Sequence, residues 1–145
     1  MIGRDPEREL LPVCQRLGIT FMAYSPLGRG FLTGSIRSSA DLETKDFRRT
    51  HPRFQEDNLR ANLGLVDHLR SLAEARSDTA AQLALAWVLQ QPWDIVPIVA
   101  TRSSKHFKGL EEHPGLGFGC VDDNAPLWSN HVCLLVPSAV EPEAE

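Results

Sequence analysis

Residues 23–34 read AYSPLGRGFLTG, an aromatic residue and a serine followed by three glycines within seven positions. The stretch ends the apolar run 19–24, ITFMAY, which is short, rich in strand-forming residues and typical of a buried parallel strand. Glycines after a strand let backbone amides approach a ligand, and consecutive amides suit a phosphate group. The spacing is neither that of a Rossmann turn nor that of a P-loop, which excludes both motifs. A glycine-rich turn needed only for packing is the alternative.

The composition is that of an ordinary globular domain: 145 residues, 42% of them hydrophobic and 23% charged, with a net charge of −4. The negative charge argues against nucleic acid or an anionic membrane as the main partner. No helical apolar run approaches the about 20 residues needed to cross a bilayer, and the N-terminus lacks the apolar segment of a secretory signal. Three irregularly spaced cysteines favour reduced thiols. These features predict a cytoplasmic protein.

The apolar periodicity predicts the order helix, strand, lid, helix, helix, strand up to residue 99. A helix is expected to begin with Asp5 as its N-cap and to end at Gly18, directly before the strand at 19–24. Residues 28–55 form a long excursion without a sustained apolar period, which is typical of a functional lid. The next helix is expected to carry one apolar stripe, made of Leu59, Leu63, Val66, Leu69, Leu72 and Ala73.

Another helix and a second strand follow. Ser77-Asp78 is expected to separate the two helices, and Thr79 and Gln82 fit a capping box that opens the second. Residues 94–99 predict a buried strand, in which Pro97 fits only where the ladder needs no donor. Residues 131–136 are a candidate for one more short strand.

The second strand ends in polar residues, in the sequence Ala100-Thr101-Arg102-Ser103-Ser104-Lys105. Two hydroxyl groups beside two cations at a strand-to-helix junction predict a grip for a phosphate monoester, which Arg102 can bind through two hydrogen bonds. A solvated polar loop is the alternative. Both strands therefore end in loops suited to phosphate. In many (β/α)8 barrels the loops after strands seven and eight form such a phosphate site. Tyr24 either lies against a planar ligand or packs in the core. Ser25 lacks the elbow motif of a catalytic serine.

A run of motifs in a fixed order resembles a known family. The motifs are RDPE (4–7), LGI (17–19), AYSPLGRGFLTG (23–34), DFRR (46–49), PRF (52–54), AQLALAWVL (81–89) and IVPI (95–98). Over roughly residues 3–107 they resemble the C-terminal half of aldo-keto reductases, in the bacterial and plant-type branch that carries YSPLGRGFLTG. That family is a (β/α)8 barrel that binds NADP(H) and reduces carbonyl groups to alcohols. The resemblance implies an α/β fold, a partial barrel whose two strands are similar to β7 and β8 of the family.

The resemblance also implies roles for individual residues in binding NADP(H). Tyr24 is similar to the residue that stacks on nicotinamide. Four residues are similar to those of the family's pyrophosphate cradle and its covering loop, namely Ser25, Leu27, Gly28 and Gly30. Three others are similar to those that bind the adenosine 2′-phosphate, namely Thr101, Arg102 and Ser103.

The sequence also departs from the family. The catalytic Asp, Tyr, Lys and His of the family lie in the first half of its barrel and have no counterpart here, so we assign no catalytic residue and expect the chain alone to be inactive. Val99-Ala100 stands where the family usually has Pro-Gly. Residues 1–107 are therefore predicted to be a partial aldo-keto reductase domain, and 108–145 a divergent Gly/Pro-rich tail, partly disordered. A complementing N-terminal half, or self-association, would cover the missing barrel surface.

Other functions are weaker hypotheses. The first alternative is a non-enzymatic nucleotide-binding or interaction module. A helix-turn-helix over residues 64–91 is disfavoured, because the second helix carries leucines and a tryptophan where a recognition helix presents Arg, Asn or Gln. A metal site built from His113, Cys120, His131 and Cys133 matches no familiar zinc spacing, so we predict no metal.

Overall fold

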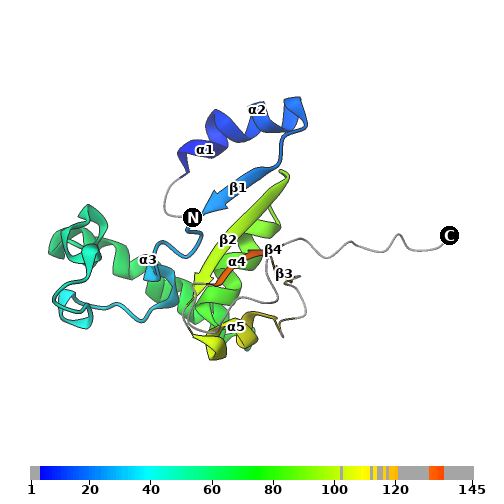
Figure 1. Ribbon diagram of the computed structural model, residues 1–145. Coiled ribbons are helices and arrows are strands. Elements are labelled where there is room, and N and C mark those ends of the chain that lie inside the picture. Colours follow the sequence, from blue (N-terminus) through cyan, green and yellow to red (C-terminus); the bar gives the residue numbers. More distant parts are fainter. Residues whose placement is uncertain are drawn as a thin grey trace. The chain divides into compact units, whose positions relative to one another are not determined.

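The computed structural model describes residues 4–101, 103–111, 113, 116, 118–120 and 131–135 (Figure 1). The chain divides into two compact units. Met1–Pro26 with Leu85–Glu145 forms one, here called the sheet unit, and Leu27–Ala84 forms the other, the 27–84 unit. Helix α4 (Ala80–Leu89) contributes its first half to the 27–84 unit and its second half to the sheet unit.

The sheet unit begins with two short helices in place of the single predicted one, α1 (Asp5–Arg8) and α2 (Leu10–Leu17). The break has a local cause in Pro12, which lacks an amide hydrogen and whose ring conflicts with the carbonyl four residues earlier, that of Arg8. The predicted stop is confirmed: Gly18 adopts a φ of 64°, and its amide donates to the last carbonyls of α2.

The predicted N-cap is wrong by one residue. Arg4 occupies the N-cap position of α1, and Asp5 is the first helical residue. The side chain of Arg4 donates from Nε to Oε1 of Glu7 at 2.8 Å. The positive charge of this N-cap residue thus offsets one of the acidic side chains in the first turn of α1.

The sheet is built around β2 (Ile95–Thr101), which pairs in parallel with β1 (Phe21–Tyr24), as the sequence predicted (Figure 1). On its other side β2 pairs antiparallel with β4 (His131–Leu135), and β4 pairs with β3 (Phe118–Cys120), giving the order β1-β2-β4-β3. The candidate strand at 131–136 is confirmed as β4, whereas nothing in the glycine-rich sequence around β3 predicted that strand.

Burial differs between the two parallel strands. Ile95, Pro97 and Val99 of β2 are buried, as predicted. In β1 the burial alternates, and the side chains of Met22 and Tyr24 are 52% and 77% exposed. Among the described residues β1 has only β2 as a neighbour, so one of its edges and one of its faces stay uncovered.

Pro97 lies where the ladder needs no donor. The amide of Phe21 donates to the carbonyl of Asp94 at 2.8 Å, and in a parallel ladder alternate residues of one strand bond to the same neighbour. Even-numbered residues of β2 therefore face β1, and the missing N–H of Pro97 lies on the opposite side. There, among the described residues, the pairing with β4 covers Ile98 to Thr101 and does not include Pro97, which agrees with the expectation for a proline in a strand.

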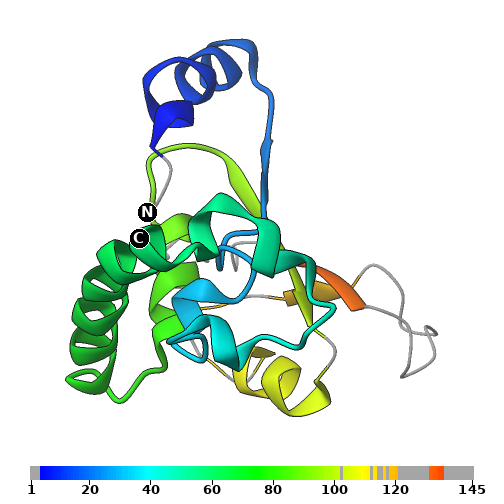
Figure 2. The same ribbon diagram turned by 90° about the vertical axis from the view of Figure 1, so that its left-hand side faces the viewer.

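The 27–84 unit has more structure than the predicted excursion. Four short 3₁₀ helices precede the helix α3 (Glu56–Glu74); they are η1 (Phe31–Thr33), η2 (Ser39–Asp41), η3 (Phe47–Thr50) and η4 (Pro52–Phe54). Figure 2 shows these turns and the long helix α3. Apolar side chains from the excursion are buried, namely Phe31, Leu32, Ile36, Leu42 and Phe54. Residues 28–55 are thus ordered by a core in which η1 and η4 contact α3, rather than forming a bare loop.

The junction of α3 and α4 agrees with the prediction from the sequence. Ser77 has a φ of 61°, and the amide of Asp78 donates to the carbonyl of Ala73 at 2.9 Å, which ends α3. The capping box is confirmed, because the amide of Gln82 donates to Oγ1 of Thr79 at 3.2 Å and the amide of Thr79 donates to Oε1 of Gln82 at 2.8 Å. In the predicted apolar stripe of α3, Leu63 is half-buried and Leu72 is 47% exposed, whereas the other four residues are buried, namely Leu59, Val66, Leu69 and Ala73.

Candidate functional site

The ends of β1 and β2 lie at the same edge of the sheet, because the two strands are parallel. Tyr24, the last residue of β1, is in register with Ile98, and β2 continues for three further residues to Thr101. The sheet unit therefore brings the residues that follow β1 and those that follow β2 to a common edge, the usual place for a ligand in a parallel sheet.

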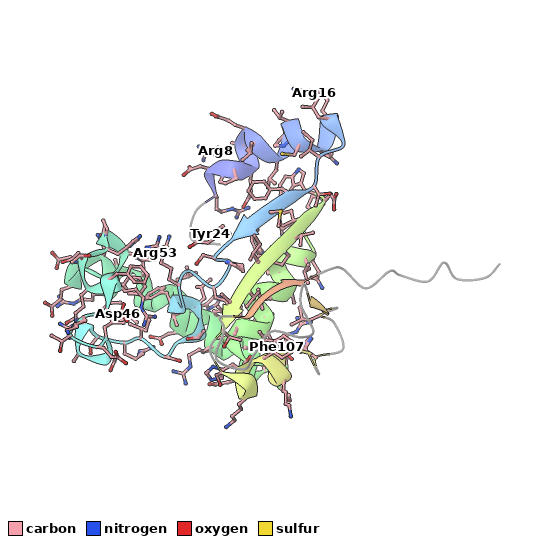
Figure 3. All side chains as sticks on the ribbon, viewed as in Figure 1. Arg8, Arg16, Tyr24, Asp46, Arg53 and Phe107 are labelled. Atoms are coloured by element: carbon pink, nitrogen blue, oxygen red, sulfur yellow. The ribbon has the colours of Figure 1, made fainter. Side chains whose placement is uncertain are left out.

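Tyr24 is exposed at this edge (Figure 3). With 77% of its surface accessible, its ring is not part of the core, so the packing alternative is wrong. An exposed ring at the carboxyl end of a strand has a face that a planar ligand can cover.

Ser25 follows in a strained backbone conformation. Its φ of 51° is left-handed, which costs a residue with a Cβ about 1–2 kcal/mol. Such conformations gather at ligand-binding sites, where the surrounding structure holds them.

The residues after β2 form the start of the helix α5 (Ser104–Glu111). Oγ of Ser103 accepts from the amide of His106 at 3.3 Å, which makes Ser103 the cap of the first turn. Oγ1 of Thr101 accepts from the amide of Ser103 at 3.1 Å. The hydroxyl of Ser103 accepts from His106 and can donate its proton to an anion, whereas the hydroxyl of Thr101 also donates to the carbonyl of Ser103 over 3.5 Å. Arg102 lies outside the described residues.

The glycine-rich stretch begins the 27–84 unit with a left-handed turn. Gly28, Arg29 and Gly30, here called the glycine turn, have φ values of 60°, 62° and 86°. The amide of Phe31 donates to the carbonyl of Gly28 at 3.3 Å and that of Leu32 to the carbonyl of Leu27 at 3.1 Å, which closes the turn. The two glycines supply the conformational freedom that the sequence predicted, whereas Arg29 adopts it despite its Cβ.

A pair of charged side chains lies against the glycine turn. Nε of Arg48 donates to Asp46 at 3.0 Å, Nη2 donates to Asp46 at 2.6 Å, and Nη1 donates to the carbonyl of Arg29 at 3.0 Å. The hydrogen bonds to Asp46 raise the pKa of Arg48 above its usual value, so the guanidinium stays charged. A Cβ added at Gly30 would lie 3.4 Å from Nη1, so the turn and the guanidinium are in close contact. Sequence reasoning assigned neither residue a role, because the carbonyl that Arg48 binds lies 19 positions away in the sequence.

His51 joins η3 to η4 and should make the stability of the chain depend on pH. Nδ1 of His51 accepts from the amide of Arg53 at 3.2 Å, and desolvation, followed by the charges of Arg29 and Arg53, lowers the pKa of His51 from 6.5. The unfolded chain therefore binds the proton more readily, so the free energy of unfolding should decrease as the pH falls through 6.5. Urea unfolding at about pH 8 and about pH 5.5 measures this change.

The control for this prediction is His51→Asn. Asparagine retains an acceptor for the cap but does not titrate, so its unfolding free energy should vary less with pH than that of the wild type. An identical pH dependence in both proteins would show that His51 does not contribute.

The candidate residues thus fall into two groups. Tyr24, Ser25, Thr101 and Ser103 belong to the sheet unit, and Leu27, Gly28 and Gly30 belong to the 27–84 unit, which follows Pro26 directly in the chain. In the part of the chain that the structure describes, no cluster of three or more His, Cys, Asp or Glu side chains could hold a metal ion. No helix among these residues is both long enough and apolar enough to cross a membrane.

Comparison with known proteins identifies the family. The sequence model of the aldo/keto reductase family matches residues 1–110. The chain is 44% identical over 110 residues to "Aldo-keto reductase yakc [NADP(+)]" of Schizosaccharomyces pombe, covering 76% of this chain and 32% of that protein. It is 46% identical over 103 residues to "Probable aldo-keto reductase 1" of Glycine max, covering 71% of this chain and 30% of that protein. The chain therefore spans about a third of the length of these relatives.

A solved structure supports the same conclusion about the fold. The glycerol dehydrogenase AKR11B4 from Gluconobacter oxydans matches with a TM-score of 0.58 and 32% identity, over 65% of this chain and 29% of that one. The α/β architecture with its parallel pair β1 and β2 is thus part of a (β/α)8 barrel, as the sequence predicted. The chain belongs to the aldo/keto reductase family.

Proposed function

We propose that this chain supplies the phosphate-binding part of an NADP(H) site in an aldo-keto reductase. The observation that carries the proposal is the parallel pairing of β1 with β2, which brings the residues after Tyr24 and those after Thr101 to one edge of the sheet. The name of the fission yeast relative includes NADP(+), which supports the choice of coenzyme.

The residues at this edge fit such a coenzyme in two respects. The exposed ring of Tyr24 offers an apolar face to nicotinamide, and Ser25 begins the segment proposed to follow the pyrophosphate. At the end of β2, the hydroxyl groups of Thr101 and Ser103 and the guanidinium of Arg102 suit the 2′-phosphate, because planar guanidinium groups bind phosphate through two hydrogen bonds.

The glycine turn is proposed to cover the pyrophosphate. Gly28 and Gly30 carry no side chain at the positions where the backbone must approach the ligand. When bound, the coenzyme supplies the hydride, and the residues of this chain hold and orient the coenzyme.

The groups that protonate the reduced carbonyl are proposed to come from the preceding part of the barrel, in a longer polypeptide or in a second chain. The edge of β1 that has no partner strand among the described residues and the exposed side chain of Met22 support this arrangement, because a neighbouring barrel strand would cover both. Reduction of a carbonyl needs a general acid at the substrate oxygen, and this sequence holds no counterpart of the family's acid.

A titration of the chain with NADP⁺ tests the proposal. At about 100 times its Kd, NADP⁺ should stabilise the folded chain by about 2.7 kcal/mol and raise Tm by about 5–10 °C. Circular dichroism on the same samples establishes that the transition is cooperative. If the chain folds cooperatively but its Tm does not change with NADP⁺, the proposal is contradicted and an interaction module is favoured.

Turnover is measured in parallel. With NADPH and 4-nitrobenzaldehyde, the chain alone should oxidise NADPH no faster than buffer. Steady reduction at rates ordinary for an enzyme would show that the acid is present within these 145 residues.

A further inference from the structure

Arg48 holds the glycine turn from outside it. Its Nη1 donates to the carbonyl of Arg29 at 3.0 Å, across 19 positions of sequence. The side chain of Arg48 is only 25% exposed, so this bond is partly shielded from competing water.

The guanidinium is aimed by Asp46. The carboxylate accepts from Nε of Arg48 at 3.0 Å and from Nη2 at 2.6 Å, and it also accepts from the backbone amide of Arg48 at 2.9 Å, which starts η3. Because the guanidinium is a rigid plane, fixing two of its nitrogens fixes the direction of the third. Nη1 is thereby directed at the glycine turn.

Phe47 contacts the side chain of Arg29, the residue whose carbonyl Arg48 binds. The guanidinium of Arg29 lies over the ring of Phe47, with its central carbon 5.3 Å from the ring centroid. Two consecutive residues of η3 therefore hold the carbonyl and the side chain of Arg29, whose left-handed φ of 62° is unfavourable and needs outside contacts to persist.

We infer that Asp46 and Arg48 are positioning residues that fix the glycine turn in the conformation that binds the coenzyme. The inference rests on the proposed function, and neither side chain is assigned a contact with the coenzyme itself. A turn that must first become ordered binds more weakly, because part of the interaction free energy is consumed in ordering it. Lysine should not replace Arg48 fully, since its ammonium group lacks the planar arrangement in which two nitrogens bind the carboxylate while the third reaches the carbonyl.

The chain offers a matched control in Arg49. This neighbouring arginine also anchors a backbone, donating from Nε to the carbonyl of Glu43 at 3.0 Å and from Nη2 to that of Leu42 at 2.9 Å. Arg48→Ala and Arg49→Ala thus each remove a guanidinium from η3, but only the first releases the glycine turn.

Hydrogen exchange of the full chain measures the turn directly. The amides of residues 31–34 donate within or next to the turn, to the carbonyls of Leu27, Gly28, Gly30 and Phe31. In Arg48→Ala these amides should exchange about tenfold faster than in the wild type, and in Arg49→Ala they should be unchanged. Arg48→Lys, which retains the charge and the stem, should show the same direction of change and serves if the alanine variant fails to fold.

Affinity for NADP⁺ measures the consequence. The Kd should rise about tenfold in Arg48→Ala and stay within about twofold in Arg49→Ala. Equal exchange rates at 31–34 in the two variants, or loosened amides with an unchanged Kd, would overturn the inference. If the wild type itself does not bind NADP⁺, the proposed function fails, and the exchange rates alone decide whether Arg48 fixes the turn.

Discussion

Phe54→Ala should lower the free energy of unfolding by about 3–5 kcal/mol. The side chain of Phe54 is 2% exposed and meets the fully buried ring of Phe31 edge to face, with ring centroids 5.9 Å apart and an interplanar angle of 84°. Removing the ring exchanges a desolvated contact for a cavity, and the rigid turns around it can close that cavity only in part. The edge-to-face pair is lost as well, which adds about 0.5–1.5 kcal/mol to the burial of the ring.

Urea denaturation compares this variant with Phe47→Ala. Phe47 is a phenylalanine of the same unit that is 63% exposed and contacts the guanidinium of Arg29, so its removal should cost no more than about 1 kcal/mol. Similar costs for the two substitutions would mean that residues 28–55 do not form the core described above.

Arg102→Ala should weaken NADP⁺ binding by about 10- to 100-fold while leaving NAD⁺ binding nearly unchanged. A guanidinium that binds a phosphate through charge-assisted hydrogen bonds contributes about 1.5–3 kcal/mol, and only NADP⁺ carries the 2′-phosphate. The assignment follows from the position of Arg102 between Thr101, the last residue of β2, and Ser103, the cap of α5.

Calorimetric titration with both coenzymes measures this selectivity. Arg16→Ala is the control, because Arg16 is an exposed arginine of α2 in the same unit (Figure 3). It also removes one positive charge from this unit, so it measures how far the loss of net charge alone weakens anion binding. A comparable loss for NADP⁺ and NAD⁺ in Arg102→Ala, or a comparable loss in Arg16→Ala, would contradict the assignment of the 2′-phosphate.

Features that depend on neighbouring residues were predictable from the sequence. The left-handed stop at Gly18 and the capping box of Thr79 and Gln82 each involve residues within four positions, and the structure confirms both. The parallel pairing of β1 with β2 was also predictable, because short apolar runs separated by helices are typical of such sheets. The break before Leu10 was equally local, since Pro12 carries the signal, and the sequence reasoning overlooked it.

Features that depend on distant residues were not predictable. The burial of Phe31 and Phe54 comes from contacts between turns that have no apolar period, so residues 28–55 carried no signal of a core. The exposure of β1 depends on what lies beside it, which its own apolar residues do not encode. The bond from Arg48 to the carbonyl of Arg29 joins segments whose separation in sequence follows no motif. The sequence therefore predicted which residues belong to the site, whereas the contacts that hold these residues in place depend on the fold.

Pro97 has a consequence for the alignment of the two parallel strands. If β2 shifted by one residue relative to β1, its odd-numbered residues would face that strand, and the missing hydrogen of Pro97 would leave a carbonyl of β1 without a donor. Pro97 is buried, so water could not easily replace that hydrogen bond. The proline thus helps to keep β1 and β2 in a single alignment.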